Sequence, residues 1–470
     1  MTNAVVVGSG PNGLAAALTL ADAGVQVHVV EAAETLGGGT RSSELTVPGV
    51  MHDECSGFHP LAVDTPFSRH FDLAAHGLTW MWADVQYAHP LDGGRGAAAY
   101  LSVDTTAAAL GADGGAWNRV FGKLDERFGD ITEDFFQPML HVPLHPVKLA
   151  RFGYFSTQPA SFAARRWSTD EGRALWAGVA AHAMRPFAAP FSSAIGVALG
   201  TAAHTYGWPV AEGGSQAIAD SMVSKLRSLG ATFETGRRVT HLDELGNPDV
   251  VMLDLNPGQV ADVASGRLSR RVDRALRRYR HGPGSFKVEF AVDGEVPWQH
   301  EESRRAGTLH VGGTYEEIAA TEKQVSRGQM PERPFVLVGQ QWLADPSRSA
   351  NGINPLYAYA HVPHGYTGDA TAAIEAQIER FAPGFRERVV AKHVRSVADM
   401  EVHNPNYVGG DVVTGANTAR QLLFRPRFAL DPYSLGADGL YVCSAATPPG
   451  GGAHGMCGWN AAHAALSKLA

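Results

Sequence analysis

The sequence predicts an α/β protein of at least two folding units, and three observations support that prediction. Residues 4–31 read as a short β-branched strand, a glycine-rich turn, a helix and a second strand. A long stretch rich in alanine and aromatic residues is then followed by several short apolar runs between residues 286 and 361. Residues 439–469 repeat the order of strand, glycine loop and helix.

The opening stretch carries Gly8, Gly10 and Gly13 directly after its first strand, in the pattern G-x-G-x-x-G. The first glycine permits a tight turn, the second lets backbone approach a pyrophosphate, and the third lets helix and strand pack closely. The helix N-terminus that follows favours phosphate charge. Glu31 closes the second strand about 20 positions later, where an acidic residue accepts hydrogen bonds from ribose hydroxyls. The stretch therefore predicts a Rossmann-like dinucleotide-binding unit.

Composition sets limits on the class of protein. The 470 residues suffice for two or three domains, and the net charge of −8 argues against non-specific nucleic-acid binding. Three cysteines form no disulfide framework, so we expect a reducing compartment and a cytoplasmic protein. The first residues enter a strand without a basic leader, and no apolar run approaches the length of a membrane span. Peripheral membrane contact is left open.

The loop after the second strand holds polar residues of mixed chemistry. A short strand is expected at 44–47, and Arg41 is either a phosphate contact or a solvated charge. His52, Asp53, Cys55 and His59 suggest a metal site, but no second ligand cluster completes one, and we expect no metal. A polar loop that lines a pocket is the preferred interpretation.

Residues 65–200 are expected to be mostly helical. Within them, residues 134–155 mix aromatic and aliphatic side chains with Lys148 and Arg151. This segment is either a membrane-docking or substrate-entry surface or an interior helical subdomain. The interior alternative is favoured, because prolines interrupt a continuous amphipathic helix.

The remaining elements predict a return to the first unit and a second sheet. A helix at 215–229 and strands at 232–234 and 249–253 belong to the first unit, followed by a basic helix at 260–280. Alternating residues at 286–292 predict a half-exposed strand. A mostly antiparallel sheet is predicted from this strand together with strands at 308–311, 335–338 and 356–361 and helices at 315–324 and 371–381. The strand at 439–443, the glycine loop at 448–458 and the helix at 459–469 then return to the nucleotide.

These motifs resemble the phytoene-desaturase-like FAD-dependent oxidoreductases, in the flavoprotein group that includes amine oxidases and GDP dissociation inhibitors. The resemblance rests on GSGPNG with Glu31, on LGGG, on PVAEGGSQAIAD and on the terminal GLYVCSAATPPGGGAHGMCGWNAA. It implies a discontinuous Rossmann-like FAD-binding domain (1–75, 205–282 and 425–470). It also implies an α+β substrate domain with a mixed sheet and a helical part (76–204 and 283–424).

The resemblance implies non-covalent FAD and a set of binding residues. These are Gly8, Ser9, Gly10, Pro11, Asn12, Gly13, Glu31, Ala32, Gly38, Gly39, Thr40, Arg41, Val239, Gly452, Gly455 and Met456. Three residues beside flavin-binding segments are candidate acids or bases: His59, His454 and Asp53. A histidine there moves a proton at neutral pH, or it is a hydrogen-bonded structural residue.

The implied function is oxidation, desaturation or isomerisation of an apolar, isoprenoid-like substrate by hydride transfer to flavin N5. Dioxygen or a quinone is the expected electron acceptor, because no second nucleotide motif is found. One alternative is a flavin amine oxidase, with Trp459 and Tyr357 as candidate aromatic residues beside the flavin. The other is a non-catalytic prenyl-binding escort protein of the GDP dissociation inhibitor type.

Overall fold

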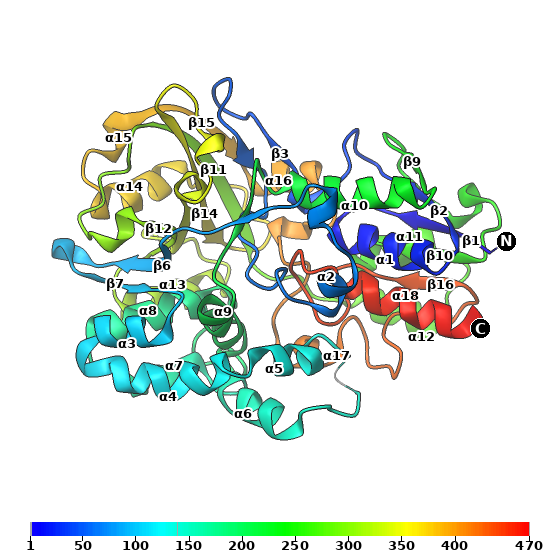
Figure 1. Cartoon of the computed structure of the whole chain (residues 1–470), viewed down its shortest axis with the longest axis horizontal. Helices are drawn as coiled ribbons and strands as arrows, with labels where there is room; N and C mark the ends of the chain where they lie inside the picture. Colours follow the sequence, from blue (N-terminus) through cyan, green and yellow to red (C-terminus); the bar gives the residue numbers. More distant parts are fainter. Residues whose placement is uncertain (1, 139, 470) are drawn as a thin grey trace.

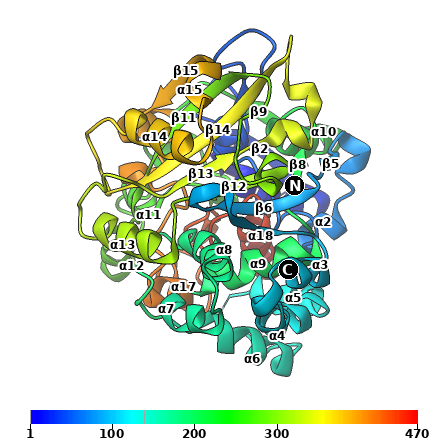
Figure 2. The ribbon, with the colours of Figure 1, turned by 90° about the vertical axis from the view of Figure 1, so that its left-hand side faces the viewer.

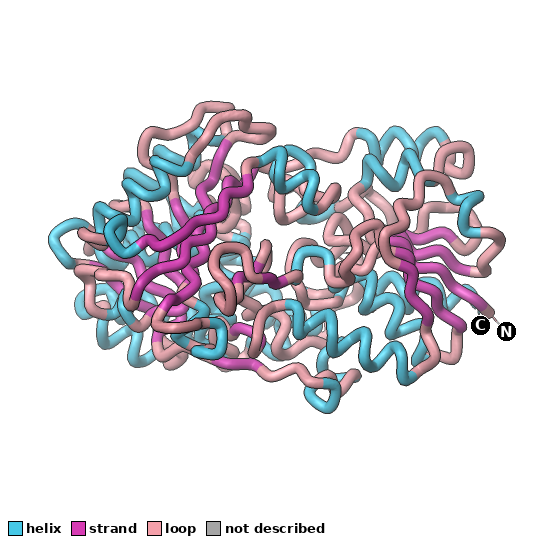
Figure 3. Tube along the Cα trace, turned by 90° about the horizontal axis from the view of Figure 1, so that it is seen from above, coloured by secondary structure: helices cyan, strands magenta, loops and turns pink. Residues whose placement is uncertain are grey.

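The computed structural model describes residues 2–138 and 140–469. The chain forms two sheets at opposite ends of an elongated molecule, with both termini beside the smaller sheet (Figures 1 and 3). The smaller sheet is parallel and five-stranded, in the order β16-β10-β1-β2-β9. Its strands are β1 Asn3–Val7, β2 Gln26–Val30, β9 Thr232–Glu234, β10 Val250–Leu253 and β16 Leu440–Val442.

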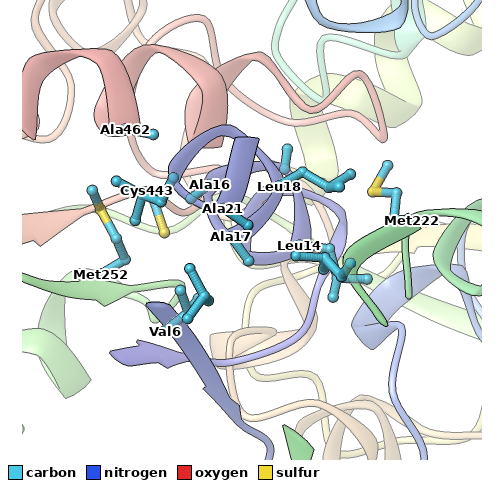
Figure 4. Packing of buried hydrophobic residues seen from close by; sticks show 14 of the residues in the cluster. Val6, Leu14, Ala16, Ala17, Leu18, Ala21, Met222, Met252, Cys443 and Ala462 are labelled. Carbon is cyan, nitrogen blue, oxygen red and sulfur yellow. The ribbon is translucent and has the colours of Figure 1, made fainter. Parts of the chain in front are cut away.

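Helices cover both faces of this sheet, as a doubly wound α/β unit requires. One face carries α1 (Pro11–Asp22), α10 (Gln216–Ser228) and α18 (Met456–Leu469), whose small apolar residues form one buried cluster (Figure 4). A Cβ on Gly458 would lie 1.9 Å from the carbonyl oxygen of Asn12, so α18 approaches α1 as closely as backbone allows. The other face carries α11 (Pro257–Val263) and α12 (Arg270–Arg277).

The larger sheet has seven strands in the order β15-β11-β14-β13-β12-β6-β7. It is antiparallel except between β12 and β6. Its strands are β6 Val85–Pro90, β7 Gly96–Ala99, β11 Gly284–Asp293, β12 Ala306–Val311, β13 Val336–Gly339, β14 Ile353–Val362 and β15 Val389–Arg395. Its helices are α13 Tyr315–Val325, α14 Thr371–Phe381 and α15 Phe385–Arg388. The mixed second sheet predicted from sequence is confirmed.

A helical layer lies below the larger sheet and joins the two ends of the molecule (Figures 1 and 2). It consists of α3 Val103–Ala109, α4 Gly114–Asp125, α5 Phe128–Phe135, α6 Pro146–Ser156, α7 Ala160–Ala163, α8 Asp170–Ala181 and α9 Ala194–Thr205. Tryptophans 117, 167 and 176 lie in its core. Shorter elements complete the chain: α2 Pro66–His70, α16 Val397–His403, α17 Ala419–Phe424, and the small strand pairs β3 Ser42–Ser43 with β4 His52–Asp53 and β5 Trp80–Met81 with β8 Val210–Ala211.

Several element predictions are wrong in instructive ways. The strand expected at 44–47 forms at Ser42–Ser43 instead, where it pairs with His52–Asp53. The region expected to be mostly helical also contributes β6 and β7 to the larger sheet. The basic helix at 260–280 is two helices. Strand β11 is buried on both faces rather than half exposed, because the loop at 52–59 covers its polar side.

The five parallel strands come from residues 1–75, 205–282 and 425–470, and the seven strands of the larger sheet from 76–204 and 283–424. The domain boundaries themselves stay a prediction.

Candidate functional site

The glycine turn between β1 and α1 lies at the carboxyl edge of the parallel sheet. Gly8 has φ +96°, and a Cβ on Gly13 would lie 2.2 Å from the carbonyl oxygen of Gly8. Pro11 occupies the first turn of α1, where its missing N–H costs no hydrogen bond. The Asn12 side chain is buried and its Oδ1 has no hydrogen-bond partner. The turn is shaped for an anion at the helix N-terminus.

Glu31 lies beside this turn, at the end of β2. Its Oε2 accepts hydrogen bonds from the backbone N and Oγ of Ser9, at 2.8 and 2.6 Å, and its Oε1 accepts one from the backbone N of Ala33. Glu31, Ala32 and Val239 line a first cavity of about 320 Å³ with the backbone of the glycine turn. The geometry places the acidic residue and the phosphate cradle on the same cavity, as the motif requires.

Arg41 lines the first cavity, but its guanidinium donates hydrogen bonds to backbone carbonyl oxygens. Its Nε donates to the carbonyl oxygen of Gly38 at 2.9 Å, and its Nη2 donates to that of His403 at 2.7 Å. A Cβ on Gly38 would lie 2.8 Å from Cα of Gly10. Arg41 therefore joins the second glycine segment to the end of α16, while Gly38 itself lies directly against Gly10.

Two further cavities continue from the first. A second cavity, of about 120 Å³, shares Gly10, Asp254, Asn404 and Asn406 with the first. A third, of about 240 Å³, shares Cys55, Ser56, Val412, Gly451 and Gly452 with the second. The predicted residues Pro11, Asn12, Gly39 and Thr40 line the second. The shared walls trace one path from Glu31 to the face of the larger sheet.

Asp254 stands where the first and second cavities meet, and sequence reasoning missed it. It follows β10, and its Oδ2 accepts a hydrogen bond from the backbone N of Gly13 at 3.1 Å. Burial raises the pKa of Asp254 to about 7, opposed by hydrogen bonds from Gly13 and Gly10 and reinforced by the charge of Glu31. A polar residue at the carboxyl end of a third parallel strand is the signal that identifies it.

Lys287 marks the far end of the path, and it was also missed. It lies on β11 opposite Tyr359 of β14. Its Nζ donates to the carbonyl oxygen of Asp53 at 2.8 Å, contacts the carboxylate of Glu289 and stands 3.8 Å from the ring centroid of Tyr357. Burial lowers the pKa of Lys287 to about 7. The third cavity thus has in its wall a buried lysine whose pKa lies near neutrality.

Other residues of the third cavity are mostly apolar or aromatic. They are Phe58, Pro60, Leu199, Trp208, Leu337, Tyr357, Tyr359, Met400 and Val413, with His182, Ser285 and Thr308. The Tyr357 hydroxyl donates to the carbonyl oxygen of Cys55 at 2.5 Å. No Asp or Glu lines this cavity in the described part of the chain.

The three residues predicted as acids or bases lie off this path. Asp53 is fully buried, 2.5 Å from Nη1 of Arg348, and it also accepts from Ser42 and from the backbone N of Ser215. Burial alone would raise the pKa of Asp53, but Arg348 and these hydrogen bonds bring it below its ordinary value. Such a carboxylate fixes the loop at 52–59 against Arg348.

The two histidines are held by neighbouring groups. His59 Nε2 lies 2.9 Å from Oγ of Ser215, and His454 Nδ1 accepts from the backbone N of Met456 at 3.1 Å. Burial lowers the pKa of each histidine to about 4, so both are neutral at pH 7. His454 lines a separate cavity with Phe67 and Trp80. Catalytic roles for His59, His454 and Asp53 stay predictions.

Some residues of the C-terminal glycine loop line the cavities, and others lie in the protein interior. Gly451 and Gly452 line the second and third cavities. Gly455 has φ +72° and lies against the ring of Phe67, while Met456 is fully buried. The predicted flavin contacts of Gly455 and Met456 stay predictions.

Among residues 2–138 and 140–469, no group of three or more His, Cys, Asp or Glu side chains is arranged to hold a metal ion. The three cysteines are free and buried. Burial raises the pKa of the Cys457 thiol to about 12, and its Sγ lies near the carbonyl oxygens of Thr447 and Gly450.

Comparison with known proteins places this geometry in context. Residues 6–76 match the family description "NAD(P)-binding Rossmann-like domain". "Pyridine nucleotide-disulfide oxidoreductase domain-containing protein 2" of Rattus norvegicus is 21% identical over 99% of this chain and 94% of its own length. "Phytoene desaturase (neurosporene-forming)" of Rhodobacter capsulatus is 22% identical over 54% of this chain and 52% of its own length.

Solved structures show the same architecture. Cyclohexylamine oxidase from Brevibacterium oxydans IH-35A superposes with a TM-score of 0.60 at 16% identity, over 100% of this chain and 99% of its own. These similarities confirm the predicted resemblance to the amine oxidase and phytoene desaturase group of FAD-dependent oxidoreductases, and with it the prediction of an oxidoreductase.

Proposed function

We propose that this chain is an FAD-dependent oxidoreductase of the phytoene-dehydrogenase-like type, which oxidises, desaturates or isomerises an apolar, isoprenoid-like substrate. One observation carries the proposal. The three joined cavities lead from the carboxylate of Glu31, past a helix N-terminus, to an apolar cavity with a buried lysine. That order of chemistry matches an extended dinucleotide whose ring end meets the substrate.

The chain's residues fit FAD held without a covalent bond. Glu31 binds the adenosine ribose, the backbone of Gly10 and Gly38 lies against the pyrophosphate, and Gly452 approaches the ring end. The tight Gly10–Gly38 contact supports this assignment, because neither glycine carries a side chain that would separate the two backbone segments beside the helix N-terminus. Cys457 is a buried thiol of raised pKa, which disfavours the thiolate that a covalent bond would need.

Bound FAD supplies a hydride acceptor at its N5 atom. Removal of a hydride and a proton from adjacent carbons leaves a double bond, so the protein must accept the proton. Lys287 Nζ is the group in the third cavity suited to accept it, with its pKa near 7 and Glu289 beside it. The apolar wall excludes water from the reacting carbons.

A flavin amine oxidase is the second candidate. The fold similarity to cyclohexylamine oxidase and the aromatic rings of Tyr357 and Tyr359 in the cavity support it. The wall chemistry favours a neutral substrate, since it offers a lysine and no carboxylate to a cationic amine. Trp459, the other aromatic residue considered, contacts Phe67 and His70 instead.

The absorption spectrum of the purified protein, taken before and after denaturation, tests the cofactor. Flavin bands that pass into the supernatant support non-covalent FAD, and bands that stay with the protein refute that part of the proposal. A colourless protein that takes up no added FAD supports the escort alternative instead.

Anaerobic bleaching then tests the substrate class. We expect apolar polyenes or their saturated precursors to bleach the flavin and primary amines to leave it oxidised. Bleaching by amines alone would favour the amine oxidase. Reoxidation by dioxygen or by a quinone would identify the electron acceptor, for which we propose one of these two.

A further inference from the structure

The segment at 140–154 exposes apolar side chains in an unusual number. Val142 and Val147 are 89% and 82% exposed, and Leu140, Leu144 and Tyr154 are also exposed. The loop that carries the first of these is held by hydrogen bonds: the Asp134 carboxylate accepts from the backbone N of Leu144 at 2.7 Å and of His145 at 2.8 Å. The apolar residues are therefore held outward by a fixed loop.

Helix α6 continues this surface. Val147, Ala150 and Tyr154 are exposed at the spacing i, i+3 and i+7, which puts them on one face of the helix. Phe152 and Ser156 are buried on the opposite side. A helix that only covers a core turns polar residues outward, so the exposed face of α6 departs from that pattern. Figures 1 and 2 both show α6 at the lower edge of the molecule.

Cations border the apolar residues. Residues 140–166 contain Lys148, Arg151, Arg165 and Arg166 and no Asp or Glu, in a chain whose net charge is −8. Lys148 forms an ion pair with Asp130 of α5, so its charge is already neutralised. The arginines are therefore the cations that border the apolar residues. The guanidinium of Arg166 lies 5.4 and 5.7 Å from the ring centroids of Phe155 and Phe162, and that of Arg165 lies 5.7 Å from Phe162. Exposed Phe162 joins the two arginines to the apolar face.

We propose that this α6 surface, made of residues 140–154 with Phe162, Arg165 and Arg166, docks on a lipid bilayer that carries anionic lipids. Apolar side chains on a fixed helix face enter the acyl boundary, while arginines beside them bind headgroup phosphates. The charge sign selects an anionic surface over a neutral one. Among the described helices none is both long and apolar enough to cross a bilayer.

The end of α5 contacts the C-terminal glycine loop and α18. Phe136, just before this segment, lies 5.4 Å from the ring of His454, and its carbonyl oxygen accepts from Nδ2 of Asn460 at 2.8 Å. The docking proposal itself does not depend on flavin chemistry.

Flotation of the full-length protein with vesicles tests the proposal. We expect flotation with phosphatidylcholine vesicles that contain phosphatidylglycerol, and at least a tenfold lower bound fraction with phosphatidylcholine alone or in high salt. Val142→Asp with Val147→Asp should abolish flotation, and Arg165→Gln with Arg166→Gln should remove the preference for anionic lipid. Val390→Asp, at an exposed valine on β15, is the matched control and should float like the wild type.

A second measurement distinguishes loss of docking from misfolding of a variant. Tyr154→Trp places a fluorophore on the exposed face, and brominated lipids should quench it on docking. No quenching and no flotation with anionic vesicles would overturn the proposal, as would unchanged flotation of the Val142→Asp/Val147→Asp variant. Concentration-dependent dimerisation that the same variant removes, without lipid binding, would identify the surface as a contact between two copies and also overturn it.

Discussion

Replacement of Asp254 by Asn should remove a pH dependence from FAD binding. The Asp254 carboxyl lies between the first and second cavities, on the backbone N of Gly13, where the pyrophosphate of a bound dinucleotide would pass. Glu31 faces it across the first cavity, with Arg41, Arg237, Arg238 and His403 also in that wall, and the thiols of Cys443 and Cys457 lie behind it. An ionised Asp254 repels the pyrophosphate, and a protonated one donates a hydrogen bond to it.

The sign and size of the effect follow from linkage. The pKa of Asp254 is raised by burial to about 7, and a bound pyrophosphate raises it further, because it disfavours the charged form. Binding therefore takes up a proton, and the Kd for FAD rises as the pH rises through about 7. Between about pH 6 and about pH 8 the protonated fraction falls roughly tenfold, so affinity weakens by up to about 1.4 kcal/mol.

Fluorescence titration of deflavinated protein with FAD, repeated across this pH range, measures the effect. The Asp254→Asn variant should bind FAD with a pH-independent Kd and more tightly than the wild type at the alkaline end. Asp262→Asn is the control, since Asp262 lines the same first cavity but pairs with Arg277 at the surface. A wild-type Kd that stays constant, or an Asn variant that keeps the full slope, would refute the reasoning.

Three other changes have expected outcomes. Gly10→Val puts a Cβ 2.6 Å from Oδ2 of Asp254 and fills the pyrophosphate path, so FAD affinity should fall at least about hundredfold, while Gly153→Ala, where a Cβ meets open space at an ordinary helical φ, should keep stoichiometric flavin at purification. Lys287→Met should keep FAD but slow flavin reduction by about 10²–10⁴-fold in stopped flow. The wild-type rate should rise with pH through about 7 as Lys287 deprotonates, and an unaltered profile in the variant would contradict the assignment. Arg348→Met leaves Asp53 and Asp345 without their buried cation, and should cost about 3–5 kcal/mol in denaturant unfolding. Removal of the exposed Arg69 should cost under about 1 kcal/mol.

The nucleotide end of the site was predictable because its signals are local in the chain. Gly8, Gly10, Gly13 and Glu31 lie within one strand–turn–helix–strand unit, so spacing alone brings them together. Strand boundaries there fall within a residue or two of prediction, as β1, β9 and β10 show. The C-terminal strand, glycine loop and helix were found by the same reasoning.

The end of the path that contains Lys287 was not predictable, because its residues meet only through tertiary pairing. Lys287 and Glu289 alternate with apolar residues on β11, the pattern of a half-solvated strand. Their side is buried because the loop at 52–59 covers it and the partner strand presents Tyr357 and Tyr359 there. No feature of the sequence of residues 284–293 predicts that another loop covers this side of the strand. Conversely, Asp53 and His59 were predicted as acids or bases from residue type alone; the structure shows contacts that fix the loop at 52–59, and their catalytic roles stay predictions.

The two ends of the chain depend on each other at this site, which explains why both termini lie beside the smaller sheet. Helix α18 can approach α1 only because Gly458 lacks a side chain, and the loop before α18 supplies Gly451 and Gly452 to the second and third cavities. Strand β16 in turn needs β10, whose following residue is Asp254. The glycine turn after β1 is therefore joined to the cavity wall formed by Gly451 and Gly452 only when the last strand, β16, is in place. Cofactor binding should accordingly stabilise the contact between α1 and α18 before it affects the larger sheet.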